Sequence, residues 1–412
     1  MVQKGISQVL IGHPVYGGNF LAKLDGKTTF VPFVLPGELV KVLPVQEQKN
    51  YLFAEPVEIS KPSDDRVQPG CPYFQRCGGC HYQHINILTQ ARIKEQILSE
   101  QLIKLGKLIT PNVRPILTNG ITTGYRNHLQ LTPNLAGKLS FVHQKPQMGL
   151  VPVERCEIAS QRINEALQFL EFDPGLKITR VSIREGKDDL LVILESDSPD
   201  VPEINVEGEF SVTHTSKGHN VVIAGNDHVV MEVSGQFFKV SAGSFFQVNS
   251  LMAAEMVQLI LREADFLPED IVFDLYCGVG LFSVFIAPLV KEVVAIEESP
   301  SSTADFAENL DRFDNVSLYE AGVAEALPFI NQKADVVIID PPRAGIEKAV
   351  LDRLVAMKPR SIIYVSCDPS TLARDLSRFS ANGYDLRFAQ PLDMFPNTYH
   401  VESVSILDRR SL

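Results

Sequence analysis

The stretch IVFDLYCGVGLFS (residues 271–283) decides the fold of the C-terminal half, because it joins an apolar run of strand length to a glycine-rich turn. Gly278 and Gly280 allow the backbone to turn tightly and to approach a ligand closely. Further apolar runs of strand length follow at 292–297, 334–340 and 361–366, with helix-like segments between them. This alternation predicts a parallel sheet covered on both faces, with ligands bound beyond the carboxyl ends of its strands.

Two acidic residues indicate the kind of cofactor that this turn would bind. Glu297 ends the next apolar run, 19 residues after Gly278, at a spacing from which a carboxylate reaches ribose hydroxyls. Asp340 ends the following run, and two prolines after it fix an extended exit that holds it at the rim of the sheet. Ser283 stands where a dinucleotide fingerprint has its third glycine. The pattern therefore favours a mononucleoside such as S-adenosylmethionine over a nicotinamide dinucleotide.

The last of these runs ends in a cysteine. The segment IIYVSCDPST (362–371) places Cys367 directly after the strand, and Pro369 prevents the strand from continuing. A cysteine in this position is either buried filler or a nucleophile at the open end of the sheet. Glu402 begins the final apolar run, behind His400. A lone glutamate there is ordinarily a solvated residue, and it gains a function only if it meets Cys367.

The N-terminal half has a different rhythm. Residues 1–58 contain strand-like runs spaced about 8 to 12 residues apart with Gly and Pro between them, which is typical of a small β-barrel. A polar linker follows at 61–70, and apolar residues recur at helical spacing over 86–107. Mixed strand-like segments over 120–245 predict an α+β region. The chain as a whole is predicted to be a multidomain α/β protein.

A cysteine-rich stretch begins the second of these regions. CPYFQRCGGC (71–80) spaces Cys71, Cys77 and Cys80 as Cys-x5-Cys-x2-Cys, and Cys156 is a candidate fourth ligand. Four thiolates suit zinc or an iron–sulfur cluster, and the spacing leaves that choice open. It differs from the Cys-x3-Cys-x2-Cys of radical enzymes. Six cysteines in a cytosolic chain of 412 residues indicate metal binding or catalysis rather than disulfides.

Charge and leader signals bear on partners and location. The net charge is −12, yet residues 59–170 carry 13 Lys or Arg and 7 Asp or Glu, while residues 171–412 have a net charge of −18. A basic region on an acidic protein can dock a nucleic acid, although ordinary scatter of surface charge accounts for it equally well. We see neither a secretory signal nor an apolar run of the roughly 18 to 20 residues that a membrane span needs. We expect a cytoplasmic protein with no membrane partner and no obligate protein partner.

Taken together, the motifs resemble those of the iron–sulfur-containing RNA 5-methyluridine methyltransferases, the uridine-C5 family that carries an N-terminal TRAM domain. The likeness covers nearly the whole chain and follows the family's order. Its motifs are LPGELVKV, CPYFQRCGGC, FFQVN, DLYCGVG, DPPRAG, YVSCDP and the terminal HVES.

The resemblance implies a fold of three parts. They are a TRAM β-barrel, OB-like, at 1–60, a central α+β iron–sulfur domain at 61–88 and 118–244, and a Rossmann-like methyltransferase domain at 89–117 and 245–412. The helix at 86–107 would then pack with the catalytic part.

The resemblance also implies roles for single residues. Cys71, Cys77, Cys80 and Cys156 would hold a [4Fe–4S] cluster. Gln247, Tyr276, Glu297 and Asp340 would contact S-adenosylmethionine. Cys367 would be the nucleophile and Glu402 the general base.

These roles make a coherent reaction. Addition of the Cys367 thiolate to C6 of a uridine would make C5 nucleophilic, C5 would take the methyl group, and Glu402 would remove the C5 proton. The target base has to leave its stack, and Phe245 is either a stacking surface for it or a core residue. Cytosine-C5 enzymes usually place a second cysteine beside a motif proline, whereas residues 340–343 read Asp-Pro-Pro-Arg. The sequence therefore favours uridine.

The RNA itself is left open. A uridine of 23S rRNA is favoured, because a cluster together with a TRAM domain resembles the bacterial rRNA enzymes, and the T-loop uridine of tRNA is the alternative. Rival hypotheses are an RNA-binding protein with a retained but inactive methyltransferase core, and a zinc-bound RNA module. One departure from the family pattern is Asp368, where asparagine is common. We expect Asp368 to point away from the thiol and to accept backbone amides.

Overall fold

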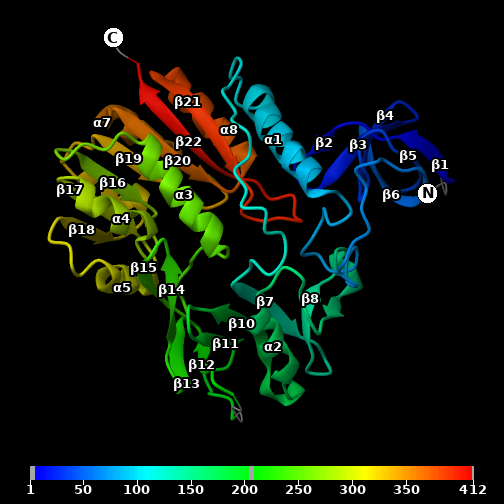
Figure 1. Cartoon of the computed structure of the whole chain (residues 1–412), viewed down its shortest axis with the longest axis horizontal. Coiled ribbons are helices and arrows are strands. Elements are labelled where there is room, and N and C mark those ends of the chain that lie inside the picture. Colours follow the sequence, from blue (N-terminus) through cyan, green and yellow to red (C-terminus); the bar gives the residue numbers. More distant parts are fainter. Residues whose placement is uncertain (1–4, 204–207, 411–412) are drawn as a thin grey trace.

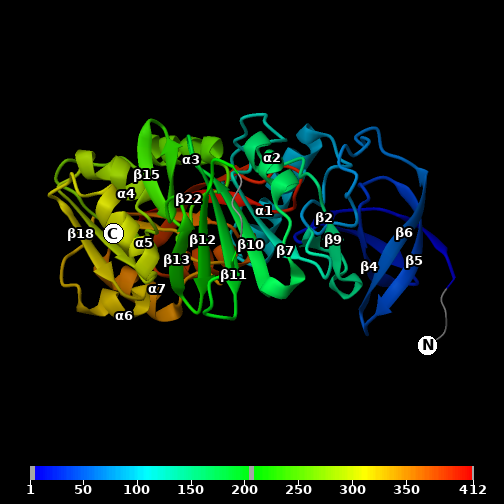
Figure 2. The ribbon, with the colours of Figure 1, turned by 90° about the horizontal axis from the view of Figure 1, so that it is seen from below.

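The computed structural model describes residues 5–203 and 208–410 and consists of three sheet-based regions (Figure 1). The N-terminal sheet and the β18 edge of the C-terminal sheet lie at opposite ends of the molecule (Figure 2). Within the described residues, every helix falls short of the length or apolarity that a membrane crossing demands.

The N-terminal region is a six-stranded sheet in the order β1-β5-β6-β4-β3-β2. Its strands are β1 (Ser7–Leu10), β2 (Pro14–Val15), β3 (Asn19–Leu24), β4 (Lys27–Pro32), β5 (Leu39–Glu47) and β6 (Tyr51–Lys61). Over the described residues the ladder ends at β1 and β2, so the closed barrel predicted from the strand spacing was wrong. The reason is local, because β2 has only two residues and its Pro14 has no N–H to donate to a further ladder.

The central region is a seven-stranded sheet in the order β13-β12-β11-β10-β7-β8-β9, antiparallel except between β11 and β12. Its strands are β7 (His128–Pro133), β8 (Leu139–Val142), β9 (Leu150–Pro152), β10 (Ile178–Glu185), β11 (Leu190–Ser196), β12 (Ser211–Ser216) and β13 (His219–Ala224). Helix α2 (Gln161–Phe169) buries Ile163, Ala166 and Leu167 in the core of this sheet. The predicted α+β character of the region is therefore confirmed.

A hairpin links the central and C-terminal regions. Strands β14 (His228–Val233) and β15 (Gln236–Ser241) pair with each other and pack against α3 (Ser250–Glu263) and α5 (Pro300–Asn309). Its buried side chains belong to the same core as those of α3.

The C-terminal region is a seven-stranded sheet in the order β18-β17-β16-β19-β20-β22-β21, in which the first five strands are parallel. Its strands are β16 (Ile271–Leu275), β17 (Glu292–Glu297), β18 (Val316–Glu320), β19 (Val336–Ile339), β20 (Ser361–Ser366), β21 (Tyr384–Leu392) and β22 (Glu402–Arg409). The other helices of this region are α4 (Leu281–Ile286), α6 (Val323–Ala326), α7 (Lys348–Met357) and α8 (Pro369–Ala381).

Apolar cores cover this sheet on both faces, as its near-continuous apolar strands predict. Val272 and Ile363 pack into one core with α3, α4 and α5. Their neighbours Phe273 and Ile362 point the other way, into a core with α7, α8 and α1 (Ile87–Lys104). The predicted Rossmann-like arrangement of parallel strands and helices is confirmed.

Helix α1 joins the N-terminal and C-terminal regions (Figure 1). Ile93 and Ile97 pack into the N-terminal core, whereas Leu98 and Leu102 pack into the C-terminal core, where α1 lies against α8. The apolar side chains of α1 therefore pack into two different cores along the length of the helix.

Candidate active site

Three adjacent strands bring Asp340, Cys367 and Glu402 to one edge of the C-terminal sheet. Asp340 follows β19, and Cys367 follows its parallel neighbour β20. Glu402 begins β22, which runs antiparallel to β20 with Ser403 opposite Ser366. The next residues along the two strands are Cys367 and Glu402, so the sheet places the thiol beside the carboxyl group. The condition under which Glu402 gains a function is thereby met.

Burial and neighbouring negative charges raise the pKa values of Cys367, Glu402 and Asp340. Burial raises the pKa of the Cys367 thiol to about 12, and the carboxyl groups of Glu402 and Asp340 add to the effect. The Glu402 side chain is buried, which raises its pKa well above the usual value, and Asp340 raises it further. Burial, with a contribution from Asp274, raises the pKa of Asp340 to about 7. The free protein therefore keeps the Cys367 thiol largely uncharged at neutral pH, and burial shifts the Glu402 carboxyl toward its protonated form.

One cation opposes these shifts. The guanidinium of Arg343 lowers the pKa of both Cys367 and Glu402. Arg343 stands in the DPPRAG motif and is exposed at the rim of the site. The sequence analysis assigned it no role, because a motif shows which residues are adjacent in the chain but not which way an exposed arginine points.

Asp368 accepts backbone amides, as predicted, but its carboxylate also helps to raise the pKa of Cys367. It is the N-cap of α8, and its Oδ1 accepts hydrogen bonds from the backbone N–H groups of Ser370 and Thr371, at 2.9 and 3.0 Å. An aspartate in this position satisfies two amides that the helix leaves free and complements the helix dipole. The Asp368 carboxylate is therefore hydrogen-bonded to the first turn of α8.

A tyrosine of the N-terminal sheet reaches the same loop. The Tyr16 hydroxyl donates to the backbone oxygen of Cys367 at 3.5 Å, and its ring meets that of Tyr399 edge-on at 5.6 Å. Nothing in the sequence pattern predicted this contact, because it joins positions 351 residues apart.

The glycine-rich turn is held by the acidic residues predicted to serve it. The backbone N–H of Gly278 donates to Oε2 of Glu297 at 3.0 Å, while Oε1 accepts from the N–H groups of Glu298 and Ser299. Tyr276 ends the strand with a φ of +63°, a backbone conformation that bends the chain sharply into the turn. Burial raises the pKa of its phenol to about 12. Three of the predicted cofactor residues thus flank the carboxyl ends of β16, β17 and β19.

The fourth, Gln247, lies elsewhere in the chain, just before α3. It is buried, and its backbone oxygen accepts from Nδ2 of Asn127 at 3.1 Å. Over the described residues, no hydrogen bond joins it to Tyr276, Glu297 or Asp340.

Sequence reasoning missed the role of Ser283. Its hydroxyl donates to Oδ2 of Asp274 at 2.6 Å, in the middle of the sheet. Burial raises the pKa of Asp274 to about 6, which makes it a second partly protonated carboxyl group beside Asp340. The residue that breaks the dinucleotide fingerprint therefore supports a buried acid.

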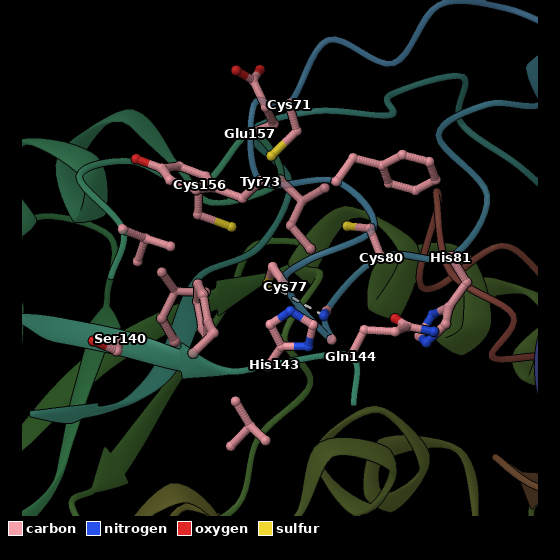
Figure 3. Close-up of a pocket in the computed structure, with 18 of the residues that line it drawn as sticks. Cys71, Tyr73, Cys77, Cys80, His81, Ser140, His143, Gln144, Cys156 and Glu157 are labelled. Atoms are coloured by element: carbon pink, nitrogen blue, oxygen red, sulfur yellow. Dashed lines mark hydrogen bonds between the residues drawn. The ribbon is translucent and has the colours of Figure 1, made fainter. Parts of the chain in front are cut away.

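The four cysteines of the predicted metal site line one cavity of about 490 Å³ (Figure 3). Cys71, Cys77 and Cys80 come from the loop before α1, and Cys156 comes from the loop before α2. An isolated bridge between Cys77 and His143 ties the first loop to the central sheet. The sequence analysis therefore grouped four residues that the fold brings to one place.

The surroundings of these thiols favour their protonated, uncharged form. Burial raises the pKa of Cys77 to about 11 and that of Cys80 to about 12. The backbone N–H of Gly79 points at Sγ of Cys77 from 3.4 Å. A Cβ on Gly78 would lie 3.2 Å from the oxygen of Val142, so a glycine suits this close approach.

The described side chains form no site for a single metal ion. Zinc bound at about 2.3 Å from each thiolate needs sulfur atoms within about 4.6 Å of one another. In the described parts of the chain, no group of three or more Cys, His, Asp or Glu side chains is arranged to hold a metal ion. The metal-ligand role predicted for the four cysteines is therefore without support from their arrangement around one ion.

Comparisons with known proteins agree with the geometry. Residues 208–410 match the family model described as tRNA (uracil-5-)-methyltransferase, and residues 6–57 match the TRAM domain model. An uncharacterized RNA methyltransferase of Streptomyces avermitilis is 33% identical over 97% of this chain and 98% of its own length. A second uncharacterized RNA methyltransferase, from Aquifex aeolicus, is 31% identical over 96% of both chains.

Among solved structures, the fold is similar to that of the tRNA (uracil-54, C5)-methyltransferase of Pyrococcus abyssi, which was crystallised with S-adenosyl-L-homocysteine. The TM-score is 0.77, and the match covers 97% of this chain and 100% of that one at 24% identity. This likeness extends to all three regions of the fold.

Proposed function

Because the chain belongs to the tRNA (uracil-5-)-methyltransferase family of RNA methyltransferases, we propose that it methylates C5 of a specific uridine in RNA and uses S-adenosylmethionine as the methyl donor. The observation that carries the proposal is the position of Cys367 beside Glu402 at the carboxyl edge of a parallel sheet. Ligands of such sheets bind at that edge.

The thiol and the carboxyl group have complementary tasks. Cys367 gives its proton to water, its sulfur forms a bond to C6 of the uracil ring, and the electrons of the C5–C6 double bond move to C5. C5 then takes the methyl group from the sulfonium of S-adenosylmethionine, which leaves as S-adenosylhomocysteine. Glu402 removes the C5 proton, the C5–C6 double bond forms again and the thiolate leaves. A base whose pKa is raised by burial is well suited to this last proton transfer.

We assign the binding of the methyl donor to Gln247, Tyr276, Glu297 and Asp340. The support is that Tyr276, Glu297 and Asp340 flank the ends of β16, β17 and β19, where the turn at Gly278 gives free access to the backbone. The carboxylate of Glu297 already orders the turn, so it would share its oxygens between amides and a ribose hydroxyl.

We further assign the RNA-binding role to the TRAM domain at 1–60 and to the basic part of the central domain. The central domain comprises residues 61–88 and 118–244, and the catalytic domain comprises residues 89–117 and 245–412. In the catalytic domain, Phe245 is 67% exposed two residues before Gln247 and offers a stacking surface to an unstacked base. A core residue of that size would be buried.

The favoured substrate is a uridine of 23S rRNA, since a cysteine segment combined with a TRAM domain resembles the bacterial rRNA enzymes. The second candidate is the T-loop uridine of tRNA. It is favoured by the fold shared with the Pyrococcus abyssi protein, which is named for uracil-54 of tRNA.

We also propose that Cys71, Cys77, Cys80 and Cys156 hold a [4Fe–4S] cluster rather than zinc. The support is that all four cysteines line one cavity of about 490 Å³. A cluster of four irons and four sulfides is wider than a single ion and needs more widely separated thiolates. Anaerobically purified protein should be brown with visible iron–sulfur absorbance, and a colourless protein with stoichiometric zinc would refute the cluster.

The test of the reaction uses tritiated S-adenosylmethionine with transcripts of tRNA and of 23S rRNA fragments. The expected result is methyl transfer to one uridine of one of these RNAs, with 5-methyluridine in the digest. Tight RNA binding without methyl transfer would instead support a non-catalytic RNA-binding protein.

A further inference from the structure

The segment that carries the cysteines is hydrogen-bonded to the turn that leads into Glu402. The backbone N–H groups of His81 and Tyr82 both donate to the backbone oxygen of Asn397, each at 2.9 Å. His81 follows Cys80 directly in the chain, and Asn397 lies five residues before Glu402. Two sites that are far apart in the sequence thus share one pair of hydrogen bonds.

Gln90 of α1 completes the connection. Its side-chain Nε2 donates to the backbone oxygens of Tyr82 and Ile85, at 3.1 and 2.9 Å, and to Oδ1 of Asn397 at 3.1 Å. Its Oε1 accepts from the backbone N–H of Asn397 at 2.9 Å. The side chain is only 2% exposed, so these bonds are shielded from water. One amide therefore holds the cysteine segment and the turn together.

The turn needs such support. Asn397 has a φ of +66°, a left-handed conformation that asparagine tolerates better than most residues but that costs free energy. Its Nδ2 donates to the backbone oxygen of Thr122 at 2.9 Å, so the strained residue is bonded on three sides. A conformation of this kind persists only where its surroundings over-determine it.

A buried ion pair lies one helical turn further along α1. Lys94 donates to Oδ1 of Asp393 at 2.6 Å and to the backbone oxygen of Phe395 at 2.9 Å, and both charged side chains are almost fully buried. Gln90 and Lys94 are spaced i, i+4 and therefore share a face of the helix. That face of α1 therefore holds the segment 393–397 by hydrogen bonds from two side chains, Gln90 and Lys94.

Aromatic contacts continue the connection toward the nucleophile. The ring of His81 meets that of Tyr399 at 4.5 Å, and Tyr399 meets both His400 at 4.3 Å and Tyr16. The Tyr16 hydroxyl in turn bonds the backbone oxygen of Cys367. Any shift of the cysteine segment thus reaches both partners of the proposed reaction through packed side chains.

We propose that Gln90 and Asn397 are positioning residues that couple the order of the cysteine segment to the placement of Glu402. The inference deepens the proposed function and rests on it for the role of Glu402. Through this clamp of hydrogen bonds, order in the cysteine segment stabilises the turn at 393–401. By the same linkage, a well-formed turn stabilises the cysteine segment.

The first test measures amide hydrogen exchange in the full-length protein. Gln90→Ala removes four hydrogen bonds, and we expect exchange about tenfold faster in peptides covering both 78–86 and 394–404. The matched control is Gln96→Ala on the same helix, whose side chain bonds only Glu100, and it should leave both peptides unchanged. Faster exchange confined to one of the two peptides would overturn the coupling.

The second test separates positioning from general loss of structure. With natural RNA, Gln90→Ala should slow product release about tenfold and let the covalent complex with Cys367 accumulate, because proton removal by Glu402 is the impaired step. Asn397→Asp keeps the acceptor for Gln90 but loses the donor to Thr122, so it should retain more of the wild-type rate than Asn397→Ala, which loses both. Equal loss in both variants, or a slower rate without accumulation, would contradict the role.

The two tests fail independently of the proposed reaction. If the wild-type protein methylates no RNA, the proposed function is wrong, and the hydrogen-exchange result still decides whether the clamp exists. If methylation is normal but hydrogen exchange in 394–404 is the same in Gln90→Ala as in the wild-type protein, only the proposed coupling is wrong.

Discussion

The molecule contains two groups of buried thiols, and they differ in what faces the sulfur. In the cysteine segment, burial alone accounts for most of the raised pKa of Cys77 and Cys80, and the other charges nearby are those of further cysteines. At the edge of the C-terminal sheet, carboxyl groups face the Cys367 sulfur as well, and these are Glu402 and Asp340. We propose the first set of thiols as ligands of a cluster, and the second thiol, beside a carboxyl group, as a nucleophile with its base.

The backbones that carry these sulfurs also differ. The cysteine segment is a loop of turns with two glycines, in which a ligand would do part of the ordering. Cys367 instead extends a fully buried strand and precedes a helix capped by Asp368, so it is fixed before any ligand binds. Predictions for single residues therefore differ in size between the two regions.

The largest effect should come from Cys367→Ala. Removal of the nucleophile is expected to lower the rate of methyl transfer at least about 10⁴-fold, because the route through a covalent adduct is lost. The control is Cys277→Ala, which removes a buried thiol two residues beyond β16 that lies near Asp274 and Glu297 rather than Glu402. Tritium transfer under single-turnover conditions measures both, and a loss of similar size in Cys277→Ala would erase the distinction.

Glu402→Gln should come next. The amide cannot take the C5 proton, so we expect the rate of product release to fall about 10² to 10⁴-fold while bond formation by Cys367 continues. The methylated RNA should then remain attached to the protein with its natural uridine. A gel that separates free from covalently bound RNA measures this, and a variant that never forms the complex would assign Glu402 a different task.

The pH dependence of thiol labelling should show a somewhat smaller effect. With a pKa of about 12, the thiolate fraction of Cys367 rises tenfold per pH unit, so alkylation by iodoacetamide should be about a hundredfold faster at pH 9 than at pH 7. The same raised pKa stabilises the fold below about pH 9, the range in which the unfolded thiol is also protonated. That contribution is lost as the pH rises from about 9 toward 12. A rate of labelling that is flat above pH 7 would mean that the thiol is already ionised.

In the cysteine segment, Cys80→Ser should act through order rather than chemistry. We expect loss of the visible iron–sulfur absorbance and a fall in methyl transfer of about tenfold, because the hydrogen bonds through His81 to Asn397 loosen. The covalent adduct with Cys367 should still form. Normal activity in a colourless Cys80→Ser protein would separate the two regions completely.

The smallest effect should come from Asp368→Asn. Asparagine caps a helix as well as aspartate does, and the oxygen that accepts from Ser370 and Thr371 is kept, so the rate should change less than about threefold. Asp368→Ala, by contrast, should lower the free energy of unfolding by about 1 kcal/mol. A large gain of activity in Asp368→Asn, with a lowered thiol pKa, would show that the effect of this carboxylate on the thiol limits the rate.

Much of the C-terminal region could be predicted from the sequence, because its strands are buried on both faces and read as continuous apolar runs. The position of Asp340 and Cys367 at one edge followed from the rule that parallel strands share a carboxyl end, whereas Glu402 lies there because the antiparallel strand β22 begins at that edge. The grouping of Cys156 with the other three cysteines rested on family resemblance, since no spacing rule joins residues 76 positions apart.

Contacts between regions could not be predicted in the same way. Two hydrogen bonds, from Tyr16 to Cys367 and between Gln90 and Asn397, depend on how the three sheets pack against one another. Hydrophobic periodicity carries no information about that packing. The closed barrel failed for a related reason. Strand spacing indicated the number of short strands, but closure depends on whether the edge strands β1 and β2 are long enough to pair.

The most direct test of the central claim traps the reaction with RNA that contains 5-fluorouridine. Fluorine cannot leave as a proton does, so Glu402 cannot complete the reaction and the adduct should persist. After digestion, mass spectrometry is expected to find a methylated fluorouridine on the peptide that contains Cys367, and none in Cys367→Ala. An adduct that survives in Cys367→Ala, or the absence of any adduct with the RNA that is methylated, would contradict the account.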